Sequence, residues 1–214
     1  EDSLETELTI SNVFEENKYS GFDRVEEGFR VNYGFLYKID NSHGNLITSS
    51  LGRSYHANKQ DSFQEENGFH NNNSEIVGNL GYSVPKTTEI YYKFRFSEKL
   101  ILKKNRIKAN FYFLSTDFDL SFMQIRDFAS SNNSNTEQIT FGMKKKIFKN
   151  WQVRFSQFRD LASAKFSTPL RSNIGVGFEN ECLSININLT KDKSNAVDIP
   201  ASTNLSFTFD LFSM

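Results

Sequence analysis

Apolar and polar residues alternate along most of this chain with a period of two. From Val25 to Ile39 the odd positions are mostly aromatic or aliphatic, and the even positions carry mainly Gly, Arg, Asn and Lys. Successive side chains of a β-strand point to opposite faces, so these fifteen residues predict one strand with an apolar face and a polar face. Ordinary strands have about 5 or 6 residues. A strand of this length with two such faces is typical of a transmembrane β-barrel, whose wall meets lipid outside and water inside.

The same alternation recurs to the end of the chain and predicts eleven strands. Nine of them are expected at residues 23–39, 45–57, 75–84, 88–98, 102–114, 118–128, 169–179, 181–190 and 202–213. The seventh strand lies between the connections 129–135 and 149–150, and the eighth runs from Trp151 to the connection 160–168. Pro85 is expected to end the third strand, because proline cannot donate to a sheet ladder. The connection 58–74 is so polar that we expect no core to cover it. The predicted fold class is all-β: an antiparallel transmembrane β-barrel.

The lengths of the connections follow a second rule. Connections after odd-numbered strands are short (40–44, 85–87, 115–117, 149–150 and 179–180), and those after even-numbered strands are mostly longer (58–74, 129–135, 160–168 and 191–201, with 99–101 as the exception). Bacterial outer-membrane barrels have short periplasmic turns and long external loops. We therefore interpret residues 1–22 as an external loop with the end of a preceding strand, and residues 23–214 as the C-terminal portion of a barrel.

The predicted barrel is incomplete. Eleven is an odd number, whereas bacterial single-chain barrels have an even number of strands, so a closed cylinder needs strands from outside this chain. The chain begins at Glu1 without an initiator Met or a signal peptide. We therefore expect it to be a piece of a longer precursor that carries its export signal upstream.

Composition agrees with one-sided strands. The chain has 22 Phe and 8 Tyr, yet Asn, Ser and Lys are abundant and the mean hydropathy is negative. No apolar run approaches the roughly 18 residues of a membrane-spanning helix. The formal net charge of -1 gives no argument for a nucleic-acid partner. The alternative is a soluble β-sandwich or solenoid, but its strands would be shorter, and an exposed apolar face of this size would aggregate.

Residues 12–34 read NVFEENKYSGFDRVEEGFRVNYG, and this segment resembles the pattern NLF..NRF.G.DR.EGG.R.NYG of the lipopolysaccharide-assembly outer-membrane proteins of the LptD family. Further matches follow in the same order: LGRSY (51–55), SEIVG (74–78), YYKFRF (91–96) with KKNRIKA (103–109), and GVGFENEC (175–182). The chain departs from the family pattern at Val13, Glu27 and Arg106.

The resemblance implies a fold and a function. In the family, a periplasmic jelly roll precedes a barrel of about 26 strands, and a lipoprotein of the LptE type plugs the lumen. This chain would then supply part of the translocon that inserts lipopolysaccharide into the outer leaflet of the outer membrane of a Gram-negative cell. The implied partners are lipopolysaccharide, the LptE-type plug, outer-membrane lipid, and periplasmic bridge proteins that reach it through an N-terminal domain. Pattern alone leaves a porin or a TonB-type receptor barrel open as alternatives.

The last strand, 202–213, is the one that the resemblance places at a lateral gate. In the family, acyl chains leave through a seam between the first and last strands, while the saccharide passes through the polar lumen. The gate residues implied here are Leu205, Phe207, Phe209 and Leu211. The strand is equally interpreted as a plain closing strand with an assembly signal in its terminal aromatics Phe207, Phe209 and Phe212, and both interpretations can hold together.

Charged residues supply two further hypotheses. Basic side chains predicted to face the lumen could contact lipopolysaccharide phosphates or the plug, although such residues are more often merely solvated. They are Arg30, Lys38, Lys93, Arg95, Arg106, Lys108 and Arg171. Asp23, Arg24 and Glu26 are adjacent at the outer end of the first strand and are candidates for an ion network that pins the external loops.

Cysteine and histidine give little sign of chemistry. The resemblance implies a periplasmic disulfide between Cys182 and the N-terminal region, outside this chain, and the alternative is a buried free thiol. His43, His56 and His70 lack the spaced partners of a metal site. A Ser/His pair of a barrel phospholipase stays open, but no motif singles out a serine. We therefore expect neither an enzyme nor a cofactor.

Overall fold

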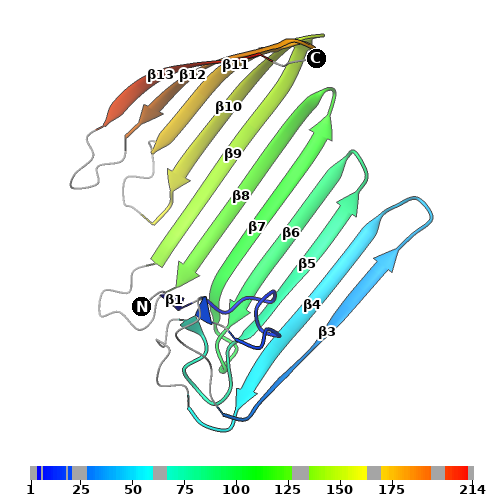
Figure 1. Ribbon diagram of the computed structural model, residues 1–214, viewed down its shortest axis with the longest axis vertical. Coiled ribbons are helices and arrows are strands. Elements are labelled where there is room, and N and C mark those ends of the chain that lie inside the picture. The colour runs from blue at the N-terminus through cyan, green and yellow to red at the C-terminus, as the bar shows by residue number, and fades with distance from the viewer. Residues whose placement is uncertain are drawn as a thin grey trace. The chain divides into compact units, whose positions relative to one another are not determined.

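The computed structural model describes residues 4–5, 7–17, 19–20, 28–59, 67–126, 135–162, 170–193 and 201–211. Two short strands, β1 (Leu4–Glu5) and β2 (Tyr19–Ser20), pair with each other. The long strands, labelled in Figure 1, are β3 (Arg30–Asp40), β4 (Leu46–His56), β5 (Ile76–Val84), β6 (Thr88–Phe96), β7 (Leu102–Phe113), β8 (Thr116–Arg126), β9 (Asn135–Phe148), β10 (Trp151–Asp160), β11 (Arg171–Glu179), β12 (Leu183–Asp192) and β13 (Ser202–Leu211).

The eleven long strands form one antiparallel sheet in which neighbours in space are also neighbours in sequence, from β13 at one edge to β3 at the other. This confirms the predicted all-β fold and the number of strands. Among the described residues, no helix is long and apolar enough to cross a membrane. The chain divides into two compact units: residues 1–85, 90–107 and 124–135, and residues 86–89, 108–123 and 136–214.

Strand pairing in the second unit preserves the predicted alternation. β12 and β13 pair over their whole lengths, and apolar residues stand opposite one another on one face, as in Leu189↔Leu205, Ile187↔Phe207 and Ile185↔Phe209. The positions between them pair Asn with Ser and Thr on the other face. β10 and β11 continue the apolar face, where the rings of Trp151 and Phe178 meet edge to face with centroids 5.1 Å apart.

Three predicted boundaries were wrong by a few residues. The strand expected from residue 23 begins at Arg30; residues 23–27 lie outside the described part of the chain, and Gly28 precedes the strand with a φ of 90°. The turn expected at 115–117 is Leu114 and Ser115, with φ values of 49° and 57°. Two positive φ values are typical of a type I′ hairpin turn, which usually selects Asn-Gly, so this sequence carried no signal for it.

The strand predicted at 181–190 is shifted by two residues and runs from Leu183 to Asp192. The side-chain oxygen of Asn180 accepts hydrogen bonds from the backbone N–H groups of Cys182 and Leu183, at 3.0 and 2.8 Å. This Asx-type turn occupies residues that the alternation alone assigned to the strand.

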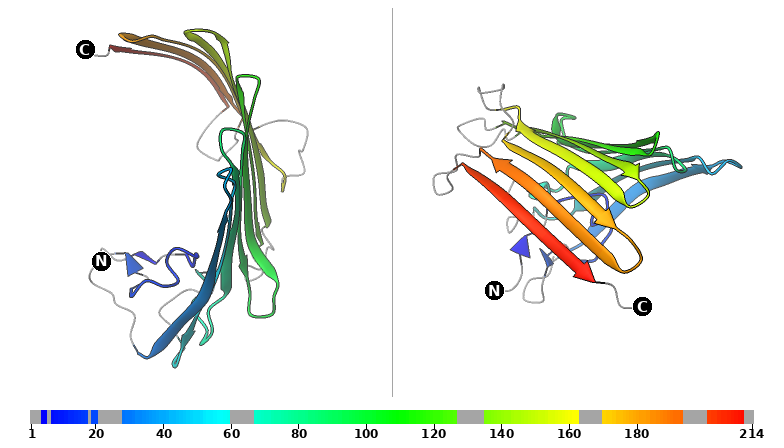
Figure 2. Two further views of the ribbon diagram at one scale, coloured as in Figure 1. Left: turned by 90° about the vertical axis from the view of Figure 1, so that its right-hand side faces the viewer. Right: turned by 90° about the horizontal axis from the view of Figure 1, so that it is seen from above.

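The first unit contains a small core that the sequence did not predict. Phe69 and Val13 are fully buried, and Leu8 and Val77 are each 2% exposed. Residues 7–17, here called the N-terminal segment, supply two of these side chains and lie on one side of β3 and β4 (Figure 2). The expectation that no core covers 58–74 was therefore wrong, because Phe69 in this connection packs under the segment.

Candidate functional site: the polar face and the edge strand

The two faces of the sheet differ in chemistry in both units. One face exposes large apolar side chains, among them Phe35 at 55% and Tyr37 at 56% on β3, and Phe207 at 65% on β13. Exposed apolar surface of this extent needs a covering medium, either lipid or a protein partner. The other face carries the polar residues, and it holds the candidate sites.

The N-terminal segment lies on the polar face of the first unit because two glycines leave room for it. Gly34 and Gly52 stand opposite each other in the pairing of β3 with β4. A Cβ atom at Gly52 would lie 2.7 Å from Val13 and 3.1 Å from the ring of Phe14. The paired glycines therefore form a shallow bed for the segment, and side chains here would displace it.

An ion network fastens this segment to the strands. Arg95 on β6, whose side chain is 10% exposed, pairs with Glu75 at 2.9 Å and with Glu7 of the segment at 3.1 Å. Lys104 on β7 also pairs with Glu7. Two cations thus meet two carboxylates. Arg95 and Glu75 are largely buried, at 10% and 14% exposed, whereas Glu7 is 37% exposed, so removal of Arg95 is the costly change.

Polar hydrogen bonds continue along β4 beneath the segment. Ser54 donates to the side-chain oxygen of Asn32 at 2.6 Å and lies 3.0 Å from Nε2 of His56. Ser50 donates to Asn79 at 2.6 Å. His56 is the last residue of β4 and is fully buried. These contacts hold the polar face of β3, β4 and β5 in one arrangement.

The register of β9 to β13 arranges a second polar surface in rows. The positions on this face are Thr140, Gly142, Lys144 and Lys146; Gln152, Arg154, Ser156 and Phe158; Arg171, Asn173, Gly175, Gly177 and Glu179; Ser184, Asn186, Asn188, Thr190 and Asp192; and Ser202, Asn204, Ser206, Thr208 and Asp210. Among these positions Phe158 is the only large apolar side chain.

Arg154 links strands that are not direct neighbours. Its Nη2 donates to Oδ1 of Asn186 at 2.7 Å and to Oδ1 of Asn188 at 3.3 Å, both on β12. The strand between them, β11, has Gly175 and Gly177 at these levels, and a Cβ at Gly175 would collide with the Asn188 amide oxygen. The glycines let a guanidinium cross β11 and tie β10 to β12.

Seven basic residues were predicted to face the lumen, and they lie on four different strands. These are Arg30 and Lys38 on β3, Lys93 and Arg95 on β6, Arg106 and Lys108 on β7, and Arg171 on β11. Arg30 is half-buried at the start of β3, and Lys93, Arg106 and Lys108 are exposed. Arg95 is committed to the ion network, and Arg171 pairs with Asp192 through Nε at 2.9 Å and Nη2 at 2.7 Å. Arg95 and Arg171 are therefore each paired with a carboxylate, on strands that are not neighbours in the sheet.

The proposed gate residues occupy the outward face of the edge strand β13. Leu205, Phe207, Phe209 and Leu211 are 73%, 65%, 51% and 72% exposed. Their strand pairs with β12 over ten positions. Phe212 lies outside the described residues, as do Asp23, Arg24 and Glu26, so the proposed loop-pinning network stays a prediction.

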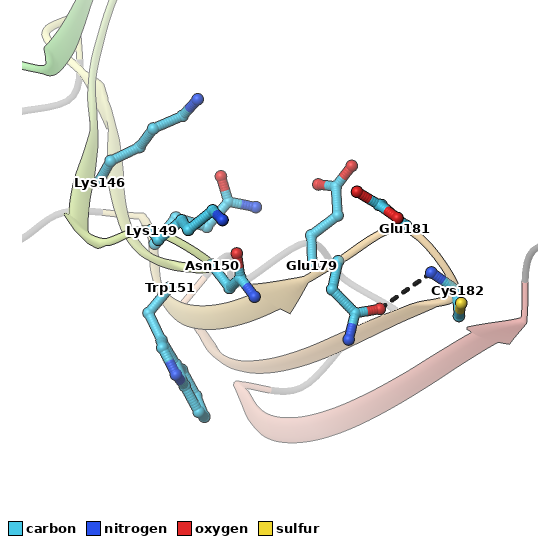
Figure 3. A pocket seen from close by; sticks show the side chains of 9 residues that line it. Lys146, Lys149, Asn150, Trp151, Glu179, Glu181 and Cys182 are labelled. Atoms are coloured by element: carbon cyan, nitrogen blue, oxygen red, sulfur yellow. Dashed lines mark hydrogen bonds between the residues drawn. The ribbon is translucent and has the colours of Figure 1, made fainter.

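Cys182 is an exposed free thiol, which contradicts the alternative of a buried one. It lines an open pocket of about 590 Å³ formed by the turn after β9 and the turn after β11. Figure 3 shows Lys146 and Lys149 on one side of this pocket, and Glu179, Glu181 and Cys182 on the other. Exposure leaves the thiol accessible to a partner cysteine, but the proposed disulfide stays a prediction.

Sequence reasoning missed the ion network of Glu7, Glu75 and Lys104, and it missed the partner of Arg171. The one available signal was the pair of glycines, Gly34 and Gly52, on a polar face, because glycines without side chains leave room for another segment to pack there. Within the described residues, no three or more His, Cys, Asp or Glu side chains come together as metal ligands.

Residues 1–151 match the family model described as LptD: LPS transport system D. A search of curated proteins finds no relative of this chain. The matched residues include β3 to β9, the N-terminal segment and its ion network, so the family match covers most of the two-faced sheet.

Proposed function

The chain belongs to the LptD family of lipopolysaccharide-transport proteins, and on this premise we propose that it forms part of the wall of a lipopolysaccharide translocon. Membership gives it a role in lipopolysaccharide transport at the outer membrane and places its sheet in an outer-membrane β-barrel. The family is one of transport and assembly proteins, not of enzymes. This also separates the chain from the porin and receptor alternatives.

The observation that carries the proposal is the division of the sheet into an apolar and a polar face. On β13 the outward apolar residues run from Leu205 to Leu211, and on β12 their partners run from Leu189 to Leu183. At about 3.4 Å per residue this apolar stretch is about 20 Å long, and at the usual tilt of about 35–45° for barrel strands it crosses about 15 Å of the roughly 25 Å apolar band of outer-membrane barrels. Lipid covers this face in the proposal, and the saccharide moves along the other.

We propose that β13 forms one side of the lateral gate for lipid A. Among the described residues, its sheet neighbour is β12 alone. A strand edge in a membrane must pair, because unsatisfied backbone groups in hydrocarbon each cost several kcal/mol, so a strand from outside this chain has to meet β13. A seam between chain ends can open with less disruption than a wall of continuous hairpins.

The remaining partners follow from the family. We propose that an LptE-type lipoprotein occupies the lumen, that periplasmic bridge proteins deliver lipopolysaccharide through a domain preceding this chain, and that Cys182 forms a disulfide with that region. The exposure of Cys182 beside the turn after β11 supports this last proposal. The exposed Lys93, Arg106 and Lys108 are proposed to contact lipopolysaccharide phosphates or the plug.

A disulfide lock tests the gate. In the full-length protein, a cysteine at Thr208 of β13 is paired with a cysteine in the first barrel strand, and lipopolysaccharide at the cell surface is measured before and after oxidation. The matched control replaces Ser206 and Asn188, which already face each other across β13 and β12. We expect oxidation of the seam pair to block export, a reductant to restore it, and the control pair to have no effect. Normal export of lipopolysaccharide by the protein with an oxidised seam would refute the proposal.

A further inference from the structure

One row across β9 to β13 brings together side chains that lie far apart in sequence. Phe158 pairs with Thr140 on β9 and with Arg171 on β11, and Arg171 pairs with Asp192 on β12. Because directly paired residues point to the same face of a sheet, these four side chains line up on the polar face. They lie at the end of the strands where the longer connections begin.

A cavity of about 360 Å³ is built on this row. It is lined by Thr140, Ser156, Phe158, Leu170, Arg171 and Asp192, among others. Small-molecule sites usually have volumes of about 300 to 1,000 Å³, with apolar or aromatic walls and a few fixed polar groups. The cavity is therefore large enough for one sugar ring and has this kind of lining.

Phe158 is the feature that needs an explanation. It is the only large apolar side chain among the polar-face positions of β9 to β13, and it is half-buried. An aromatic ring on a water-filled face has no lipid to cover it. The face of the ring is electronegative, so it attracts the weakly positive C–H bonds on the flat side of a pyranose.

The polar groups beside Phe158 suit the hydroxyls of the same ligand. Arg171 uses Nε and Nη2 to bond one oxygen of Asp192, at 2.9 and 2.7 Å. These two bonds fix the plane of the guanidinium, which has five N–H donors in all. Arg171 is thus held in place with further donors for a hydroxyl or phosphate oxygen, and the hydroxyls of Thr140 and Ser156 line the same cavity.

We propose that this cavity binds one pyranose ring of the saccharide portion of lipopolysaccharide, stacked on Phe158 and hydrogen-bonded by Arg171 and Asp192. The inference rests on the proposed function, because it assumes that the saccharide travels along the polar face. On that path the cavity lies at the end with the longer connections, where the saccharide leaves the lumen. The cavity is thus a weak binding site that the saccharide occupies before its release.

The test measures binding of delipidated core oligosaccharide to the purified full-length protein in detergent micelles, by saturation-transfer NMR and equilibrium dialysis. Phe158→Leu keeps an apolar side chain but removes the ring, and Phe158→Tyr keeps the ring. We expect Phe158→Leu to weaken binding roughly fivefold, the size of one aromatic contact, and Phe158→Tyr to bind like the wild type. Asp192→Asn should also weaken binding, because it loosens Arg171.

The matched control is Phe155→Leu, the same substitution on the same strand but on the outward face, and it should leave binding unchanged. Equal binding by Phe158→Leu and the wild type, or no binding of the oligosaccharide by the wild type, would overturn the inference. Its failure is separable from failure of the translocon proposal, because the disulfide lock on β13 reads export without reference to this cavity.

Discussion

Replacing Phe69 by Ala should release the N-terminal segment from the polar face. Phe69 is fully buried against Leu8, Val13 and Val77, which are 2%, 0% and 2% exposed. Phe→Ala at such a site costs about 3 to 5 kcal/mol, since transfer free energy is lost and a cavity remains. At about 1.4 kcal/mol per factor of ten, even the lower figure raises the open population of the segment more than 100-fold.

Hydrogen exchange of the full-length protein in detergent micelles measures this opening. The amide of Leu8 donates to the carbonyl oxygen of Asn67 at 3.0 Å, and the amide of Glu75 donates to that of Gly68 at 2.9 Å. The Leu8 amide should exchange roughly 100-fold faster in Phe69→Ala, because its bond joins the segment to Asn67 and breaks when the segment lifts; the Glu75 bond contains no residue of the segment and serves as the internal reference. The amides between β12 and β13 should keep their rates, because the opening is local.

The control variant is Phe207→Ala. Phe207 is 65% exposed on the outward face of β13, so its truncation leaves the core around Phe69 intact, and the Leu8 amide should exchange as in the wild type. An unchanged rate at Leu8 in Phe69→Ala would refute the reasoning. The segment would then be held by its ion pairs rather than by burial.

Three further predictions concern the sheet and the thiol. Gly34→Ala places a Cβ against the backbone oxygen of Leu51 and should lower the free energy of unfolding in urea by about 1 to 3 kcal/mol, whereas Gly177→Ala meets only the side chains of Asn186 and Gln152 and should cost less than about 1 kcal/mol. Arg95→Met should cost about 3 to 5 kcal/mol in the same assay and Glu7→Gln much less, because Arg95 is buried and Glu7 is 37% exposed. Cys182→Ser should abolish a mobility difference between the oxidised and reduced full-length protein on gels, and an unchanged difference would exclude the proposed disulfide.

The strands could be predicted from sequence because the alternation of apolar and polar residues is complete within each strand. A strand that separates lipid from water must alternate at every position, so the residues of β12 encode its two faces without help from other strands. Turns were placed less well, because Leu114 and Ser115 adopt positive φ values without the glycine that usually reports them. Asn180 shifted β12 through side-chain bonds that the alternation does not reveal.

The small core of the first unit could not be predicted, because its members are isolated in polar surroundings. Phe69 is flanked by Gly68 and His70, and Leu8 follows an acidic stretch, so neither belongs to an apolar run. Their burial depends on which segment lies on the glycine bed of β3 and β4. That is a property of contacts between distant parts of the chain, and the sequence pattern reports only local ones.

The same distinction explains why the candidate sites gather on the polar face. On the outward face one requirement, contact with lipid, is met by any large apolar side chain, so residue type alone is enough. The polar face has to meet water, the N-terminal segment and, in the proposed function, the transported saccharide, so each position depends on its neighbours in the row. Arg154 can reach the amides of β12 because the register places Gly175 opposite it on β11, and Arg171 is fixed because the register places Asp192 opposite it. The period of two assigns a residue to a face, but only the register assigns it to a row, and it is the row that places Phe158 beside the Arg171–Asp192 pair.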